Sequence, residues 1–482
     1  MQKRKVVLYY ALSLFNNGNR MAENNKIVRD LTQGNVAKTM IDFAMPLFFS
    51  SLLVTLYNVV DMVVIGHVEG KNGLGALTIG TEILHFLYFV GMGFSNAGQV
   101  IVAQLTGAGE KERVSRVIGT LLTFHFIAAL VMMALSLIFS GQILSLMKTP
   151  DAIREETASY FRICLYGLLP TYGYNVISSV LRGMGDSRHP LLFVAISTVL
   201  NIVLDLLFIC WWKLGAAGAA LATVISQTVS FVLAFAFMYH LRDHFGFDFK
   251  LKSFKMTADA FSPLMKLGLP MLFQSASISF SMLLVNRWIN GYGLVAAAMT
   301  GVGNKISLIV NVVNVSFGTA AGSMIGQCIG AEKYDRVPKI LGVSLAINSA
   351  ISFVMAVAVI VVPRWVFGLF TSDTDVLDMA MTYIPVALLL FLGSALRSPM
   401  MGLINGSGNF NLNLIVAILD GIIIRIGISW VLGFLCGFGV YGFWYGNAIA
   451  GLMPFFIGGV YFVTGAWRTR KYILMKQERN RI

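Results

Sequence analysis

Charge is what this sequence contains least of. Asp, Glu, Lys and Arg together make up 12% of its 482 residues, about half of the share that is usual in soluble domains. Hydrophobic residues account for 57%, and the mean hydropathy is +0.75. A chain of this size has too few charged side chains here to cover a surface exposed to water. The composition therefore excludes an ordinary soluble globular protein.

Cysteines and metal-ligand patterns are also scarce. The four cysteines are scattered through apolar segments, without the spacing of a metal site or a disulfide framework, at Cys164, Cys210, Cys328 and Cys436. We interpret them as packing residues. His240 and His244 have the i, i+4 spacing of metal ligands, but no third ligand is evident near them in the sequence. No nucleophile–base pattern is present either, so the sequence predicts no enzyme, no metal site and no cofactor.

Long apolar runs are abundant instead. Segments such as PLFFSSLLVTLYNVVDMVVIG and ISFVMAVAVIVVPRWVFGLF contain the roughly 20 mostly apolar residues that a transmembrane helix needs. The sequence predicts an all-α membrane protein with twelve transmembrane helices, near residues 37–66, 76–104, 114–140, 157–181, 189–211, 216–239, 261–289, 294–326, 338–362, 379–403, 412–435 and 440–464.

Basic residues are distributed unevenly over the predicted loops. Of the 36 Lys and Arg residues, 26 lie on the two termini, on the even-numbered loops or in the span ends next to them, five lie on odd-numbered loops and five lie deeper within spans. By the positive-inside rule, both termini and the even-numbered loops face the cytoplasm, in a multi-pass protein of the cell (inner or plasma) membrane. The net charge of +13 therefore indicates topology, and we expect no nucleic-acid partner. The N-terminal run MQKRKVVLYYALSLF lacks a small-residue cleavage site, so we expect no signal peptide, and Met21 is a second candidate start.

The chain contains an internal repeat with an offset of about 223 residues. AQLTGAGEKERVSRVIG (103–119) aligns without a gap on GQCIGAEKYDRVPKILG (326–342), and RGMGD (182–186) falls on NGSGN (405–409) at the same offset. The offset spans six helices, an even number, so the two halves have the same orientation in the membrane. This is the parallel type of repeat that is known from secondary transporters.

The repeat predicts two six-helix lobes around a central cleft. The longest polar stretch between spans, RDHFGFDFKLKSFKMTADAFS, lies between them. We divide the chain into a cytoplasmic N-terminal segment, an N-lobe, a cytoplasmic linker, a C-lobe and a basic cytoplasmic tail, at residues 1–36, 37–241, 242–260, 261–465 and 466–482.

Ionisable groups inside the spans are candidate functional residues, because a charge at the bilayer centre costs at least about 2.5–3.5 kcal/mol. Asp61, Asp205 and Thr223 are predicted at one depth, roughly 8–12 Å below the outer surface. Asn201 precedes Asp205 by one turn and shares its helix face. Two close carboxylates cannot both stay ionised in a low dielectric, so the group can hold a proton, or it can bind Na⁺ with its oxygen atoms. The alternative is that each Asp only hydrogen-bonds a neighbouring helix.

The remaining intramembrane charges are harder to assign. Glu82 reaches the same depth as the carboxylates, where a structural role and a functional one are equally open, and it aligns with Lys305 in the second half. Asp420 and Arg425 are five residues apart, which places them on different faces of an α-helix, so we expect no ion pair between them.

The segment DLTQGNVAKTMIDFAMPLFFSSLLVTLYNVVDMVVIGH, with the later RGMGD and NIVLD, resembles the multidrug and toxic compound extrusion (MATE) family. The resemblance is greatest to its prokaryotic DNA-damage-inducible F-like branch, and it extends from about Asp30 to Trp467. It implies twelve helices in two lobes, antiport of organic cations against H⁺ or Na⁺, and alternating access to the cleft.

The resemblance also implies a set of site residues. The family's cation-coupling site falls on the residues discussed above and on the backbone carbonyl of one more residue, namely Asp61, Asn201, Asp205, Thr223 and Ala219. Its substrate path falls on Tyr57 and Asn175, and on Ser178 where the family has an asparagine. The acidic site that another branch has in its second lobe finds no equivalent here.

We therefore expect a cation-coupled multidrug efflux antiporter, acting as a monomer on organic cations within the lipid bilayer. The alternative is a flippase for lipids or lipid-linked oligosaccharides of the same superfamily, because its phosphate groups would need basic residues in the cavity. Four candidates for such residues lie in the second half, Arg287, Lys305, Arg397 and Arg425. The acidic first lobe weighs against this alternative, and a channel fits two asymmetric lobes less well than alternating access does.

Overall fold

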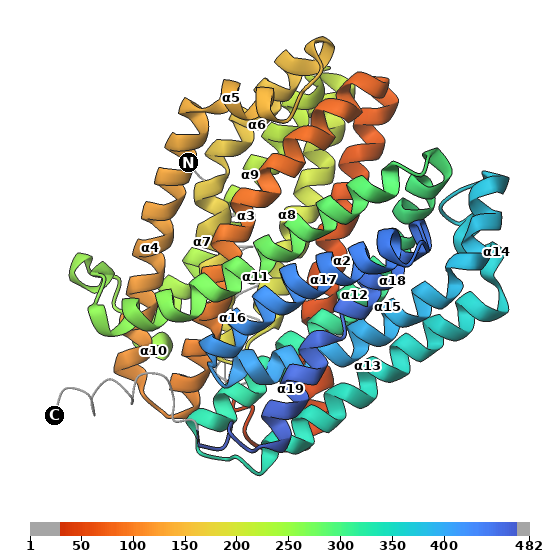
Figure 1. Ribbon diagram of the computed structural model, residues 1–482. Helices are drawn as coiled ribbons and strands as arrows, with labels where there is room; N and C mark the ends of the chain where they lie inside the picture. Colours follow the sequence, from red (N-terminus) through yellow and green to blue (C-terminus); the bar gives the residue numbers. More distant parts are fainter. Residues whose placement is uncertain (1–28, 470–482) are drawn as a thin grey trace.

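A computed structural model describes residues 29–469 of the chain (Figure 1). These residues are helical, with no strand in this range. The expectations for the first residues, including the absence of a signal peptide, and for most of the basic tail lie outside the described part.

The first half of the described chain forms the N-lobe, drawn in red to yellow-green in Figure 1. Its elements are α2 (Val36–Val68), α3 (Gly70–Gly107), α4 (Lys111–Ile138), α5 (Ser140–Leu146), η1 (Asp151–Ile153), α6 (Arg154–Tyr166), α7 (Leu168–Gly183), α8 (Arg188–Asp205), η2 (Leu206–Trp211) and α9 (Gly215–His240). Two short helices follow in the linker, α10 (Arg242–Phe245) and η3 (Leu251–Phe254).

The second half forms the C-lobe, which begins with the green α11 and ends in blue. Its elements are α11 (Ala258–Asn290), α12 (Leu294–Gly330), α13 (Arg336–Val361), α14 (Pro363–Gly368), α15 (Thr374–Gly406), α16 (Phe410–Ile418), η4 (Leu419–Ile424), α17 (Arg425–Trp430), η5 (Val431–Leu435), α18 (Val440–Ala450) and α19 (Met453–Val463). Two lobes of six spans each confirm the predicted fold class.

Eleven helical stretches of the described chain are long and apolar enough to cross a membrane. The predicted fourth span is divided at Gly167 into α6 and α7, each too short alone. Pro170 lies in the first turn of α7, and its missing N–H cannot donate to the carbonyl of Tyr166. With this broken span included, the chain has twelve spans.

Three segments of the described chain are wound as π-helix: η2, η4 and η5. Such segments are rare and often occur at functional sites. η2 follows Asp205 directly, and η5 lies at the equivalent place in the second half of the repeat. η4 contains Asp420.

Four clusters of buried apolar residues make up the core, of which two are shared by the lobes and two lie within a single lobe. One cluster joins α3, α4, α7 and α9 of the N-lobe to the start of α11. A second joins the start of α2 to α12, α13 and α15. The other two each lie within one lobe, around Tyr160 in the N-lobe and around Tyr383 in the C-lobe.

The two shared clusters lie toward one end of the bundle, which we call the basic end. It is the end that carries the loops 108–110, 184–187, 241–257, 331–335 and 407–409, and it lies toward the lower left of Figure 1. The two clusters that belong to single lobes lie toward the opposite end. The lobes are therefore joined by their cores at the basic end and have separate cores at the opposite end.

Candidate functional site

Two carboxyl groups meet inside the N-lobe. Asp61 lies on α2 and Asp205 is the last residue of α8, and these two helices pack against each other. Asp61 is 5% exposed and Asp205 is fully buried. Asn201, one turn before Asp205 on α8, is buried beside them at 2% exposure. The structure thus brings together Asp61 and Asp205, which the sequence placed at one depth, and Asn201, which it placed on the same helix face as Asp205.

The polar atoms of this group are short of partners. The Asp61 and Asp205 carboxyl groups interact directly. Yet both Asp205 oxygens, one Asp61 oxygen and both amide atoms of Asn201 lack a hydrogen bond to a donor or acceptor of the protein. Two ionised carboxylates can only accept hydrogen bonds and therefore cannot bond to one another. A hydrogen bond between them requires a proton on one of the two carboxyl groups. A shared proton or a bound cation would remove the cost of these buried atoms, which is otherwise several kcal/mol.

The donor set suits a small hard cation or a proton. It offers carboxylate and amide oxygens, which hard cations prefer. In the described residues no cluster of three His, Cys, Asp or Glu side chains exists that could hold a transition metal. The carboxyl pair therefore suits proton transfer or the ligation of a cation by oxygen atoms.

A group of three tyrosines lies on one side of the carboxyl pair. Tyr57, one turn before Asp61 on α2, interacts through its hydroxyl with Gln227 of α9 and lies close to the Asp61 carboxyl group. Tyr160 of α6 lies near Asp61 as well, and its hydroxyl is 3.2 Å from the Thr81 hydroxyl of α3. Tyr88 of α3 lies near both tyrosines.

Three of these neighbours were not predicted from the sequence: Tyr88, Tyr160 and Gln227. The available signal was weak, since each is a single polar group in an apolar run. Their proximity depends on how α3, α6 and α9 are rotated about their axes. Only packing determines that rotation.

Thr223 and Ala219 lie on α9, which packs against α8 and contacts α2. Ala219 is fully buried and Thr223 is half-buried. In the described structure no hydrogen bond joins Thr223 to either carboxyl group. Their membership of a cation site remains a prediction.

The remaining predicted residues lie apart from the pair. Ser178, on α7, accepts a hydrogen bond of 2.7 Å from Arg182, which also donates to Gln99 at 2.9 Å near the basic end. Asn175 is half-buried on α7, and no hydrogen bond joins it to Asp61 or Asp205. Glu82 is exposed on α3, close to His85.

A second charged cluster lies in the C-lobe, and it corrects one expectation. Asp420, fully buried, forms ion pairs of 2.7 Å with Arg425 and 2.8 Å with Arg397 of α15. The expectation that Asp420 and Arg425 would not pair was wrong, because it assumed an α-helix. Asp420 lies in the π-helix η4, where residues five apart fall above one another. Arg425 also donates to the Asn447 side chain.

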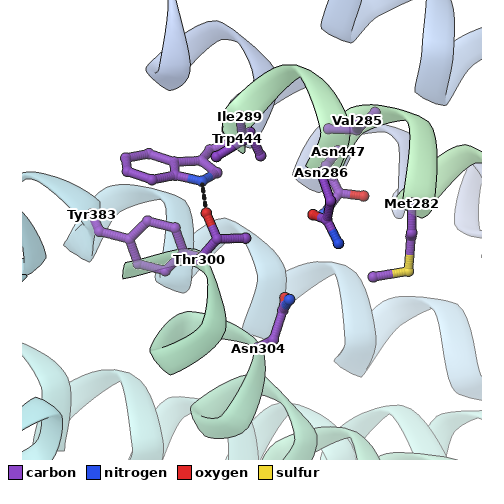
Figure 2. A pocket seen from close by; sticks show the side chains of 9 residues that line it. All are labelled: Met282, Val285, Asn286, Ile289, Thr300, Asn304, Tyr383, Trp444 and Asn447. Atoms are coloured by element: carbon purple, nitrogen blue, oxygen red, sulfur yellow. Dashed lines mark hydrogen bonds between the residues drawn. The ribbon is translucent and has the colours of Figure 1, made fainter. Parts of the chain in front are cut away.

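Asn447 connects this cluster to a small cavity (Figure 2). The indole N–H of Trp444 donates to the Thr300 hydroxyl at 2.9 Å on one side. Its lining is amide, aromatic and apolar, from Met282, Val285, Asn286, Ile289, Thr300, Asn304, Tyr383, Trp444 and Asn447.

The two lobes differ in charge at equivalent places. The repeat aligns PLFFS (46–50) with PMLFQ (270–274), which puts Val285 where the N-lobe has Asp61. It also aligns GAAGAA (215–220) with GVYGFW (439–444), which puts Asn447 where the N-lobe has Thr223. The acidic pair therefore exists in the N-lobe, and the equivalent region of the C-lobe is neutral beside a cluster with two arginines and one aspartate.

Comparison with known proteins gives consistent matches. The family model described as MatE matches residues 46–207 and 270–431, one segment in each lobe and together more than half of the chain. "Probable multidrug resistance protein YoeA" of Bacillus subtilis (strain 168) is 28% identical over 432 residues, which cover 88% of this chain and 93% of that protein. "Multidrug export protein MepA" of Staphylococcus aureus (strain MSSA476) is 24% identical over 403 residues, covering 83% and 88%.

Solved structures give the same fold. One is described as the "Outward-facing conformation of a multidrug resistance MATE family transporter of the MOP superfamily". It superposes with a TM-score of 0.85 at 21% identity, covering 92% of this chain and 99% of that one.

Proposed function

The chain belongs to the MatE family, and from this premise we propose that it is a multidrug efflux transporter that exports lipophilic organic cations in exchange for H⁺ or Na⁺. The names of its relatives, a multidrug resistance protein and a multidrug export protein, support the class of cargo. The observation that carries the coupling is the buried pair of Asp61 and Asp205, in which both Asp205 oxygens and one Asp61 oxygen have no hydrogen-bond partner in the protein.

In this proposal the carboxyl pair binds the coupling ion and the organic cation in turn. When it holds the coupling ion, its charge is reduced and the organic cation loses its electrostatic partner. When it releases the ion, the charge returns and attracts the next organic cation. A ligand can shift the protein between two conformations only by binding them unequally. The pair supplies this difference because the coupling ion and the organic cation compete for the same negative charge.

The tyrosines suit the aromatic and cationic parts of such a cargo. Tyr57 and Tyr160 lie close to Asp61, and Tyr88 lies near both of these tyrosines. A cation over the face of an aromatic ring gains about 0.5–2 kcal/mol, more when it is desolvated. An acidic centre bordered by aromatic rings therefore favours lipophilic cations over anions.

The flippase alternative is less well supported. Arg397 and Arg425 are both held in ion pairs by Asp420, so one of their two positive charges is compensated within the C-lobe. Lys305 and Arg287 are exposed single charges. No pair of arginines is therefore left in this cluster to hold a phosphate group, and the relatives are named for multidrug resistance and export.

We further propose that the basic end faces the cytoplasm in the cell membrane and that one chain, with both lobes, is the working unit. A reporter active only in the cytoplasm should be active when fused after Asp248, in the linker between α10 and η3. The same reporter should be inactive when inserted within 148–156, which runs from the loop after α5 to the start of α6, because this segment lies at the opposite end. The reverse pattern would contradict this topology.

The substrate class is tested by accumulation of dyes in cells that lack other efflux pumps. Expression should lower the accumulation of ethidium severalfold and leave anionic dyes of similar size nearly unchanged, because the binding centre is acidic. Cells that express the protein with Asp205→Asn, at matched level, provide the control. Equal lowering of both dye classes, or of neither, would count against the proposed function.

A further inference from the structure

Two hydrogen bonds at the basic end are related by the internal repeat. The Gln104 side chain, near the end of α3, donates to the Gly406 carbonyl at the end of α15, at 2.8 Å. The Gln327 side chain, near the end of α12, donates to the Gly183 carbonyl at the end of α7, at 3.0 Å. The offset of 223 residues carries Gln104 onto Gln327 and Gly183 onto Gly406. Each lobe thus donates an equivalent hydrogen bond to the other lobe.

Two glycines bring the same helix ends into backbone contact. A Cβ on Gly107 would fall 2.0 Å from the Gln327 carbonyl oxygen, and one on Gly330 would fall 1.9 Å from the Gln104 carbonyl oxygen. Real Cβ atoms do not approach backbone this closely. Both glycines are therefore required for this contact between α3 and α12, and they too are related by the repeat offset.

The segment Asp30–Gly34, before α2, ties into the same place and is called the strap below. The Leu31 backbone N–H donates to the Gln327 side-chain oxygen at 2.9 Å, and the Leu31 side chain is fully buried. Lys333 donates to the Thr32 hydroxyl at 2.7 Å. Arg336 donates to the Gly34 carbonyl at 2.9 Å. The strap precedes the N-lobe and is held by the C-lobe.

A further bond between the lobes lies one turn deeper. The Gln99 side chain donates to the Ser323 hydroxyl at 2.7 Å, and Arg182 holds the other end of the Gln99 amide. These contacts are buried and polar, and they lie at the end where the lobes share their cores. When the lobes separate, water can form hydrogen bonds with the same polar groups. Hydrogen bonds of this kind therefore suit a contact that must form and break repeatedly.

We propose that this seam, made of Gln104, Gln327, their two carbonyl partners and the strap, is the gate that closes the basic end of the cleft, and that it opens once in each transport cycle. This inference rests on the proposed function in one respect only: a transport cycle is what requires the seam to open. The repeat explains how one motion can break both glutamine bonds: because the two bonds are equivalent by the repeat, a tilt that parts the lobes at the basic end separates both together.

Distances between spin labels across the seam test the proposal without any need for transport. Arg188 and Asn411 are exposed, lie in opposite lobes at the basic end and are related by the repeat offset. Labels on cysteines at these two positions, with the native cysteines replaced, should show mainly the short, closed distance in lipid nanodiscs. The double variant Gln104→Leu, Gln327→Leu should raise the share of the long distance by at least about threefold, since it removes both bonds from the closed state only.

The matched control is Gln142→Leu, the same change at an exposed site on α5, and it should leave the distances unchanged. If the double variant does not yield folded protein, Lys333→Met removes the bond to the strap at an exposed side chain and should shift the distances in the same direction. Wild-type distances in the glutamine variant, or in Lys333→Met where that replaces it, would overturn the proposal. A seam that opens in a protein that exports nothing would contradict the proposed function and leave the gate intact.

Discussion

Asp205→Asn is expected to reduce export to less than about a tenth of the wild-type rate, a rise of more than about 1.4 kcal/mol in the barrier. The change keeps the size of the side chain and part of its hydrogen-bonding capacity, and it removes the group that can carry a charge. Because Asp205 is fully buried beside Asp61, the loss of charge ends the competition between coupling ion and cargo. The export rate is measured as ethidium efflux from preloaded cells, at matched amounts of protein in the membrane.

The partner substitution sharpens this test. Asp61→Asn should have the same effect, and the double variant should be little worse than either single one, because groups that act as a unit are not additive. Asn201→Ala should weaken export less, since it leaves both carboxyl groups in place. Asp151→Asn, at a side chain that is 99% exposed, is the matched control and should export normally. Near-normal export by Asp205→Asn would mean that the carboxylate is only structural.

Asp420→Asn is expected to destabilise the protein by about 3–5 kcal/mol, which is typical when one partner of a buried ion pair is removed. Arg425 is 5% exposed and would be left in the C-lobe without a full counter-charge. Thermal unfolding in detergent should show a clear fall in the midpoint. The effect arises from the two ion pairs of 2.7 and 2.8 Å that meet on one carboxylate.

The control for this change is Asp378→Asn. It removes an ion pair of 3.1 Å with Arg364, in which the two side chains are 74% and 69% exposed. Such surface pairs contribute about 0–1 kcal/mol, so the midpoint should hardly move. Equal midpoints for the two variants would show that the Asp420 cluster does not stabilise the C-lobe.

Much of the fold could be predicted from apolar length and from the repeat. The spans needed only their hydropathy, and the parallel arrangement of the lobes followed from an offset of six helices. The break at Gly167 was missed because the apolar run continues through it, and the lost backbone bond at Pro170 is a local effect. The pairing of Asp420 with Arg425 was missed because nothing in the sequence marks η4 as a π-helix.

The candidate site divides in the same way. Depth and helix period brought Asp61, Asn201 and Asp205 to one level, where the structure has them buried together. Their role in coupling remains a prediction. Tyr88, Tyr160 and Gln227 come from three other helices, so their approach depends on packing between helices and not on any spacing along the chain. The seam is similar, because the repeat identified Gln104 and Gln327 as equivalent but gave no sign that they would bond across the lobes.

The central claim is that the Asp61–Asp205 pair couples a cation gradient to export. The most direct test uses purified protein in lipid vesicles, with a pH gradient and a Na⁺ gradient imposed separately and ethidium movement followed. We predict that at least one of the two gradients drives ethidium against its own gradient in the wild-type protein. Neither gradient should do so with Asp205→Asn, although Asp151→Asn should behave like the wild type. Wild-type transport that is indifferent to both gradients, or a variant Asp205→Asn that still responds to one of them, would contradict the claim.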